Sequence, residues 1–194
     1  LGLLAGAALA GSRAPPTSLS SSQRPDQGVI AYSEEDGQSV LQRVTVVPYG
    51  VLGTQLLTSG TIARKAEEPG ERTTVVDPAG LKYIQKLGPG KAGGASGATY
   101  KWLGIASEAA FPAAVRESVR DVGDAGFHDY AGEGVIHVVG PNFGDARYGG
   151  PHGKLWAGEE LVQAYENVLR EFAARGAGGV LRLLPISGGI FAGH

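Results

Sequence analysis

The pattern of hydrophobic and polar positions is clearest near the C-terminus, where it predicts a long amphipathic helix over residues 159–175. Apolar side chains recur there every three or four positions on one face: Leu161, Ala164, Tyr165, Val168, Leu169 and Phe172. Glu159 and Glu160 at the start and Arg175 at the end match the helix dipole. Gly176 is a typical stop. We expect the apolar face of this helix to pack on a sheet.

Shorter apolar runs predict the strands of that sheet. Residues 134–139 and 180–186 are continuous runs without polar alternation, which is typical of strands covered on both faces. Residues 73–76 predict a third strand. Residues 28–33 and 42–49, separated by an acidic turn, predict a hairpin at the sheet edge.

Two helices are expected between these strands, over residues 98–103 and 112–122, and residues 52–72 carry no firm pattern. Strands that alternate with helices favour an α/β fold with helices on both faces of the sheet.

The N-terminal residues have a different composition. Residues 1–11 are apolar but fall short of the ~20 residues of a membrane span. They are either the remnant of a targeting peptide or a short helix packed on the domain or a partner. Residues 12–27, rich in Ser, Pro and Arg, read as an irregular linker. We therefore divide the chain into residues 1–27 and a domain over 28–194.

Charge and composition limit the kinds of ligand and catalytic group that the chain can have. The net charge of −2 and a sequence pI of about 6.1 show no basic nucleic-acid footprint. The chain has no cysteine, which excludes disulfides, thiolate nucleophiles and cysteine-ligated zinc. The four histidines form no helical zinc-binding pair, so no metal site is expected.

Glycine is the unusual residue, with 32 in the chain. Two glycine-rich segments, 88–97 and 187–193, follow predicted strands, where α/β proteins collect ligands. Backbone N–H groups in such loops can cradle a phosphate. Ordinary turn chemistry explains them equally well on composition alone.

Common phosphate and hydrolase motifs do not fit these segments. The G-x-G-x-x-G match from Gly88 to Gly93 does not directly follow a strand and lacks the acidic partner of a dinucleotide site. A Walker loop would need glycine at Gln85 and a hydroxyl at Ala92. A nucleophile elbow around Ser187 would need glycine at Pro185.

Three segments together resemble the macro-domain family. GGASGATYKWLG at 93–104 is similar to the family's GGGVDGAIHxAAG, GVIHVVGP at 134–141 to VIHxVGP, and LPISGGIFAG at 184–193 to PxISTGIFG. They occur in family order, and the resemblance covers about residues 73–193. It implies a three-layer α/β/α macro-type fold with a central mixed sheet and an ADP-ribose cleft at the carboxyl edge.

The resemblance also implies two ligand-binding loops. The first, near the distal ribose and diphosphate, comprises Gly93, Gly94, Ala95, Ser96 and Gly97. The second, with backbone donors on the diphosphate, comprises Ser187, Gly188, Gly189, Ile190 and Phe191. Phe191 falls where the family places an aromatic against the ribose, and core packing is its alternative. His137, inside a strand, is expected to be a satisfied core histidine.

Departures from the family argue against hydrolysis. Gly80 stands in place of the asparagine that orients ribose and water in hydrolytic members, and Ser96 in place of their catalytic aspartate. We therefore expect no catalytic residue. Asp77 is a candidate ligand contact in place of the missing adenine-reading acid near residues 49–51, although an Asx-type turn before Pro78 is favoured for it.

These features lead to a ranked expectation of function. First is a module that binds ADP-ribose, a related nucleotide diphosphate or an ADP-ribosylated protein, with no cofactor. Second is a non-catalytic subunit of a larger assembly, with protein partners at the N-terminal segment and an open sheet edge. An active hydrolase is third. The edge is expected because the family continues past the second loop with a helix and a strand, and this sequence stops at His194. We expect an intracellular protein, organellar if residues 1–11 are a targeting remnant.

Overall fold

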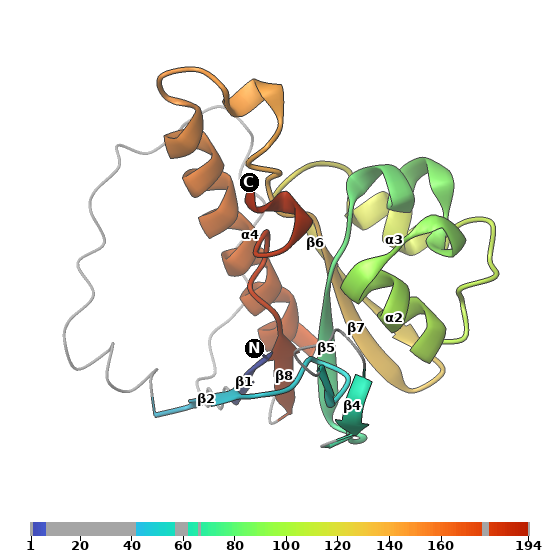
Figure 1. Cartoon of the computed structure of the whole chain (residues 1–194). Helices are drawn as coiled ribbons and strands as arrows, with labels where there is room; N and C mark the ends of the chain where they lie inside the picture. The colour runs from blue at the N-terminus through green and yellow to red at the C-terminus, as the bar shows by residue number, and fades with distance from the viewer. Residues whose placement is uncertain (1, 7–41, 57–61, 66, 176–178, 194) are drawn as a thin grey trace.

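The computed structural model describes residues 2–6, 42–56, 62–65, 67–175 and 179–193. Within them the chain forms an α/β fold built on a six-stranded mixed sheet (Figure 1). The sheet order is β2-β1-β8-β5-β7-β6. Its strands, in that order, are β2 (Val44–Val47), β1 (Gly2–Gly6), β8 (Val180–Leu183), β5 (Thr73–Pro78), β7 (Glu133–Val138) and β6 (Ala125–Tyr130).

The centre of the sheet is parallel and its margins are antiparallel. β5 pairs in parallel with β7 on one side and with β8 on the other. β6 runs antiparallel to β7, and β1 runs antiparallel to both β8 and β2. The strands predicted from the apolar runs at 73–76, 134–139 and 180–186 are confirmed as these three central strands.

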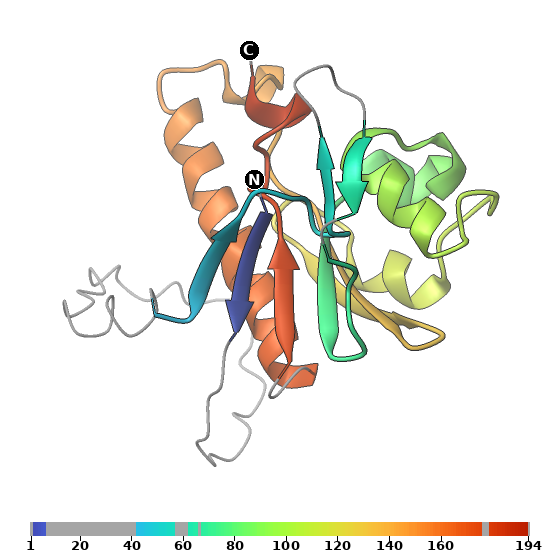
Figure 2. The ribbon, with the colours of Figure 1, turned by 60° about the horizontal axis from the view of Figure 1, so that its bottom comes forward.

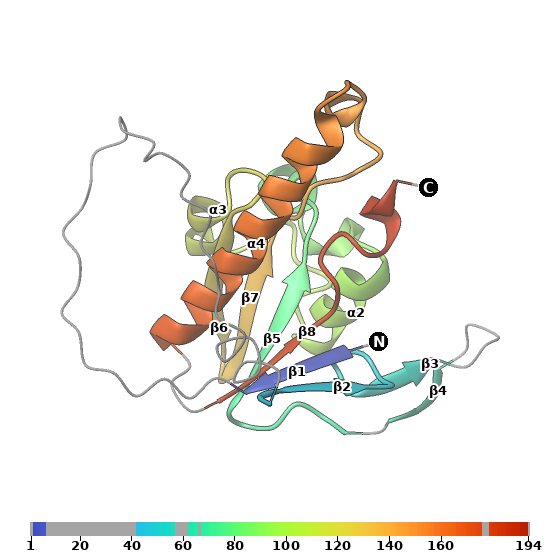
Figure 3. The same cartoon turned by 90° about the vertical axis from the view of Figure 1, so that its left-hand side faces the viewer.

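Helices cover both faces of the sheet, as predicted (Figures 1 and 3). One face carries α2 (Gly94–Trp102) and α3 (Ala113–Ser118) together with the short turns η1 (Tyr83–Leu87) and η2 (Pro89–Lys91). The other face carries α4 (Gly153–Arg175). Two further turns, η3 (Ala146–Tyr148) and η4 (Ile190–Ala192), lie in the connections.

Strand alternation divides the core between the two faces. Val76 and Ile136 pack against the buried face of α4. Their neighbours Val75 and Val135 belong to a separate cluster that includes Trp102 at the end of α2. Successive side chains of a strand point to opposite faces, so β5 and β7 supply both layers at once.

The N-terminal part of the sheet differs from the prediction. Gly2–Gly6, for which a short helix was one alternative, is a strand inserted between β2 and β8 (Figure 2). The other half of the predicted hairpin, residues 28–33, lies outside the described residues, and β2 pairs with β1. The position beside β8, where an open edge was expected, is therefore filled, because pairing with two neighbours satisfies the backbone of this apolar segment.

Some elements carried no recognisable signal. Residues 52–72, left without an assignment, contain a two-stranded sheet of β3 (Thr54–Leu56) and β4 (Ile62–Lys65). β6 was also missed, because its sequence AGFHDY begins with small residues and carries polar ones. The predicted helix boundaries were too short for α2 and α4, which begin at Gly94 and Gly153, and too long for α3.

A buried arginine fastens the region around β3 and β4 to the main sheet. Arg182 on β8 is 3 % exposed, and its guanidinium donates to three carbonyl oxygen atoms. These belong to Val51 (3.5 Å), Glu67 (3.0 Å) and Glu68 (3.3 Å). The Glu67 carboxylate lies 3.3 Å from the same group. Charge-assisted hydrogen bonds of this kind are stronger than neutral ones.

Among the described residues, no helix has the length and apolar character needed to cross a membrane.

Candidate functional site

Three connections meet at the carboxyl edge of the sheet. Because β5, β7 and β8 are parallel, the segments that follow them leave the sheet on the same side. The segment after β8 contacts the segment after β7 twice: the Ser187 hydroxyl donates to the Pro141 carbonyl at 2.6 Å, and the Phe143 N–H donates to the Phe191 carbonyl at 2.9 Å. These bonds hold residues 187–191 over the ends of the strands.

Both glycine segments are anchored to the exit of β5. Ser96 lies in the first turn of α2, and its hydroxyl donates to the Pro78 carbonyl at 3.3 Å. The Phe191 ring comes within 3.7 Å of the position that a β carbon would take at Gly80. Both the first segment, 93–97, and the second, 187–191, therefore lie next to the exit of β5.

The backbone of the first segment is open. No heavy atom lies within 4 Å of the β-carbon positions at Gly93 and Gly94, and Gly94 has a φ of +60°, which favours glycine. Gly97 is required for packing, because a β carbon there would lie 2.7 Å from the Ala92 carbonyl oxygen. No side chain caps α2 at Gly93. The first N–H groups of a helix have no intrahelical partner, so this end is a favourable place for an anion.

The second segment combines open backbone with one half-buried aromatic ring. Gly189 has free space around its β-carbon position, whereas a β carbon at Gly188 would lie 2.9 Å from the Pro185 side chain. Ile190 is 92 % exposed, and Phe191 is partly buried next to Gly80. Ser187 has a φ of +58°, an uncommon value outside glycine. Exposed or strained positions of this kind cluster in ligand-binding loops.

Asp77 lies apart from these loops, in the core. Its side chain is fully buried, and Oδ2 accepts hydrogen bonds from the Tyr100 hydroxyl at 2.6 Å and from His137 Nδ1 at 2.8 Å. An Asx-type turn before Pro78, the favoured expectation, is wrong: Oδ1 has no hydrogen-bond partner, and Oδ2 is used across the core. Because no part of Asp77 reaches solvent, a ligand at the edge does not meet this carboxylate.

The network around Asp77 continues to Tyr130. His137 is fully buried on β7, in register with Asp77 on β5, and its Nε2 lies 2.8 Å from the Tyr130 hydroxyl. The expectation of a satisfied core histidine is confirmed. Burial, followed by the charge of Asp77, raises the pKa values of Tyr100 and Tyr130 well above the ordinary tyrosine value. Both hydroxyls therefore stay protonated and serve as hydrogen-bond donors.

That tyrosines belong to this network was not predicted from the sequence. Tyr100 and Tyr130 stand 23 positions after and 7 positions before their partners Asp77 and His137. No local spacing signals such a contact. The one available hint was His137, a polar residue inside the run 134–139 that was predicted to be covered on both faces, whereas Asp77 follows the predicted strand 73–76 by one position.

The two positions at which the sequence departs from the pattern of hydrolytic macro domains lie near the carboxyl edge. Gly80 provides no side chain, and the Ser96 hydroxyl is engaged with the Pro78 carbonyl. In the part of the chain that the structure describes, no cluster of histidines and carboxylates could hold a metal ion.

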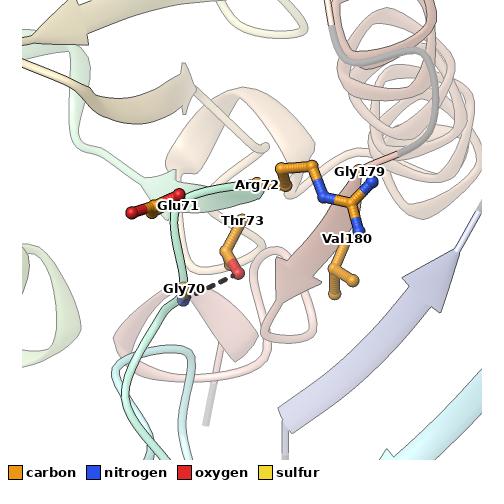
Figure 4. Close-up of a pocket in the computed structure, with 6 residues that line it drawn as sticks. All are labelled: Gly70, Glu71, Arg72, Thr73, Gly179 and Val180. Carbon is orange, nitrogen blue, oxygen red and sulfur yellow. Dashed lines mark hydrogen bonds between the residues drawn. The ribbon is translucent and has the colours of Figure 1, made fainter.

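Two cavities lie at the opposite, amino edge. One of about 390 Å³ is bounded by the first residues of β5 and β8 and those just before them (Figure 4): Gly70, Glu71, Arg72, Thr73, Gly179 and Val180. The Thr73 hydroxyl in its wall already accepts a hydrogen bond from the Gly70 N–H at 3.0 Å. The other, of about 250 Å³, shares part of this lining and extends to Phe127 and Arg175. Their linings mix arginine and carboxylate, so neither cavity is selective for one sign of charge.

No protein-family model matches the chain, and a search of curated proteins found no significant relative.

Proposed function

We propose that this chain is a macro-type domain that binds ADP-ribose, or a related nucleotide diphosphate, at the carboxyl edge of its sheet without hydrolysing it. One observation carries the proposal: two glycine segments with open backbone lie next to the exit of a single central strand, β5. In α/β sheets this is where nucleotides bind.

The chemistry of the edge suits a diphosphate linked to sugars. The uncapped start of α2 offers backbone N–H groups and the positive end of a helix dipole. The segment 187–191 brings a second stretch of glycine backbone, and Phe191 offers an aromatic surface to a ribose or base. The resemblance of the three sequence segments supports the same ligand.

Isothermal titration calorimetry with ADP-ribose tests the proposal. We expect a saturable heat with ADP-ribose and a weaker one with AMP, which lacks the diphosphate. If folded protein gives no heat at millimolar ADP-ribose, the proposal is wrong. Release of ADP-ribose from a modified protein would contradict the absence of hydrolysis.

Glycine-to-glutamate variants locate the ligand. Gly93→Glu and Gly189→Glu place bulk and negative charge where the β carbon meets no neighbour, so the fold should tolerate them. Each should weaken ADP-ribose binding at least about tenfold, since like charges repel in a phosphate site. Gly158→Glu on α4, where the β-carbon position is also open, is the matched control and should bind as the unmodified chain does.

A second candidate function is that of a non-catalytic subunit of a larger assembly. The observation that favours it is a set of exposed large apolar side chains, half of them on α4.

A further inference from the structure

α4 carries a second apolar stripe besides the one that it buries. Leu155, Val162 and Leu169 recur at seven-residue spacing and are 62 %, 58 % and 49 % exposed. Residues seven apart lie nearly above one another on a helix. We call these three side chains the α4 row. It spans about 21 Å, the length of 14 helical residues.

The α4 row lies on the flank of the helix that faces away from β6. Asn167 donates from its side chain to the Gly123 carbonyl at 2.9 Å, and Glu171 accepts from the Phe127 N–H of β6 at 3.2 Å. At about 100° per residue, Val162 is displaced by roughly 140° from Asn167 around the helix. Tyr165, between the row and the buried face, accepts from the Ile186 N–H just after β8. The row therefore lies on the β8 side of α4.

The sheet beyond β8 also presents an apolar side chain on this face. Residue 3 of β1 pairs in register with both Leu183 of β8 and Val46 of β2. Residues paired in register point to the same face, and Leu183 packs in the cluster beneath α4. Val46 is thus on the α4 side of the sheet, where it is 60 % exposed. Figure 3 looks at this side and shows β1 and β2 diverging from α4 with no described helix over them.

Two carboxylates border the α4 row. Glu159 and Glu166 follow Leu155 and Val162 by four positions each, and both are exposed. Residues four apart are neighbours on the helix surface, so Leu155 and Val162 have an acidic rim along their outer side, whereas Leu169 is followed by Arg170. An occupant of the row that carries positive charge at this rim would gain from it.

Two possible occupants are disfavoured by charge. In a symmetric dimer, packing two copies of the row antiparallel about Val162 brings Glu159 near Glu166 of the other copy. Like charges at that distance oppose association. Residues 7–41 of the same chain hold two arginines against four carboxylates, so they too are net acidic.

We propose that the α4 row is the docking site for an amphipathic helix of a second protein, with apolar residues at three- and four-residue spacing and lysine or arginine along one flank. Helices lie on apolar surfaces in this way through anchors at i, i+3, i+4 and i+7. The rim glutamates select the partner by charge, and the row supplies the buried area. The proposal is independent of ligand binding at the carboxyl edge.

A pair of designed peptides tests this assignment with the full chain. Both are helices of about 18 residues with the same leucine row, and they differ only in a lysine or a glutamate flank. In fluorescence anisotropy, the lysine peptide should bind at least about tenfold more tightly than the glutamate peptide, and the difference should shrink in high salt. The Glu159→Lys, Glu166→Lys double variant should reverse the preference.

Point variants distinguish binding at the α4 row from non-specific peptide binding. Val162→Asp should abolish binding of the lysine peptide, while Ala174→Asp, on an exposed part of α4 away from the row, should leave it unchanged. Binding of neither peptide, equal binding of both, or indifference to Val162→Asp in a folded protein would overturn the proposal.

The absence of cysteine allows a direct test of the other occupants. Val162→Cys introduces a single thiol, and Ala174→Cys is its exposed reference on the same helix. Equal labelling rates in the monomer support an open row. A Val162→Cys rate at least about tenfold slower in the monomer would show that the chain covers its own row, since a buried thiol reacts slowly. A dimer in sedimentation that Val162→Asp dissociates would assign the row to a second copy.

Discussion

The two faces of the central sheet are filled by different chemistry. The α4 face is packed mainly by apolar side chains, with buried valine, isoleucine, leucine, alanine and phenylalanine. The α2 face holds Asp77 and His137 at its centre, joined to Tyr100. The same two strands build both faces, since Val76 and Ile136 precede Asp77 and His137 by one position each.

The difference concerns how strictly each face positions its helix. Apolar packing tolerates changes of shape as long as volume is kept. The position of α4 therefore depends on the amount of apolar surface that it buries, without a requirement for one fixed geometry. A hydrogen bond of 2.6 Å between Tyr100 and Asp77 demands one position of α2. Since α2 begins at Gly94, the polar face also sets where the first glycine segment lies, which links the core to the proposed ligand site.

Removing the carboxylate is the strongest way to break the polar face. Asp77→Ala leaves His137 Nδ1 and the Tyr100 hydroxyl buried without their partner. We expect a loss of about 3–5 kcal/mol in the free energy of unfolding, the usual cost of breaking a buried pair. Urea denaturation followed by circular dichroism measures it.

Replacing the whole polar group tests whether it stabilises the fold or only orders it. A triple variant with Asp77→Leu, Tyr100→Phe and His137→Phe should be more stable than Asp77→Ala, since an apolar replacement of a buried pair is often neutral. If the triple variant is the less stable of the two, the network is a net source of stability and the contrast between the faces is smaller than we infer.

Truncating the apolar face should cost somewhat less. Leu181 is fully buried beneath α4, and Leu181→Ala should lower the free energy of unfolding by about 2–4 kcal/mol through lost burial and a cavity. The same urea titration measures it. In contrast to Asp77→Ala, ADP-ribose binding should be unchanged in the protein that remains folded, because α2 keeps its anchor.

Loss of a single hydroxyl gives a smaller, sharper effect. Tyr100→Phe removes the 2.6 Å bond to Asp77 and keeps the ring, which packs edge-on against Phe111 with centroids 5.1 Å apart. We expect a cost of about 1–2 kcal/mol in the free energy of unfolding. A calorimetric titration should also show weaker ADP-ribose binding. Unchanged affinity would mean that the Tyr100–Asp77 bond does not set the position of the glycine segment 93–97.

The smallest expected effect is a pH dependence from His128. Its partial burial, with His137 next in effect, lowers its pKa below the ordinary value of 6.5. The unfolded chain therefore takes up this proton more readily, so stability falls as the pH drops below about 6.5. His128→Gln should reduce the change in urea midpoint between about pH 7.5 and pH 5.5. If His128→Gln leaves this pH dependence of the urea midpoint as it is in the unmodified chain, other titratable groups cause it.

The sequence predicted the elements whose signal is local. The apolar runs of β5, β7 and β8 and the periodicity of α4 follow from burial of continuous segments, and each was found, although α4 begins six residues before its predicted start. β6 and the β3–β4 pair were missed because their stability comes from pairing and from contacts such as that of Arg182, which no local pattern reveals.

The candidate site shows the same division. The glycines of 93–97 and 187–191 were recognisable because the sequence itself shows which residues are glycine, and glycine gives the backbone this conformational freedom. The role of Asp77 was not, because its partners Tyr100 and His137 lie 23 and 60 positions away. The exposed row of α4 was also overlooked, since Leu169 had been counted with the buried face.

The placement of β1 has a consequence for how the chain folds. Residues 3–6 pair with residues 180–183, so β1 and β8 can pair only after a segment of more than 170 residues has been brought back on itself. Contacts this distant in sequence slow folding. We expect the sheet to close late, after β5, β6 and β7 have already assembled around α2 and α3.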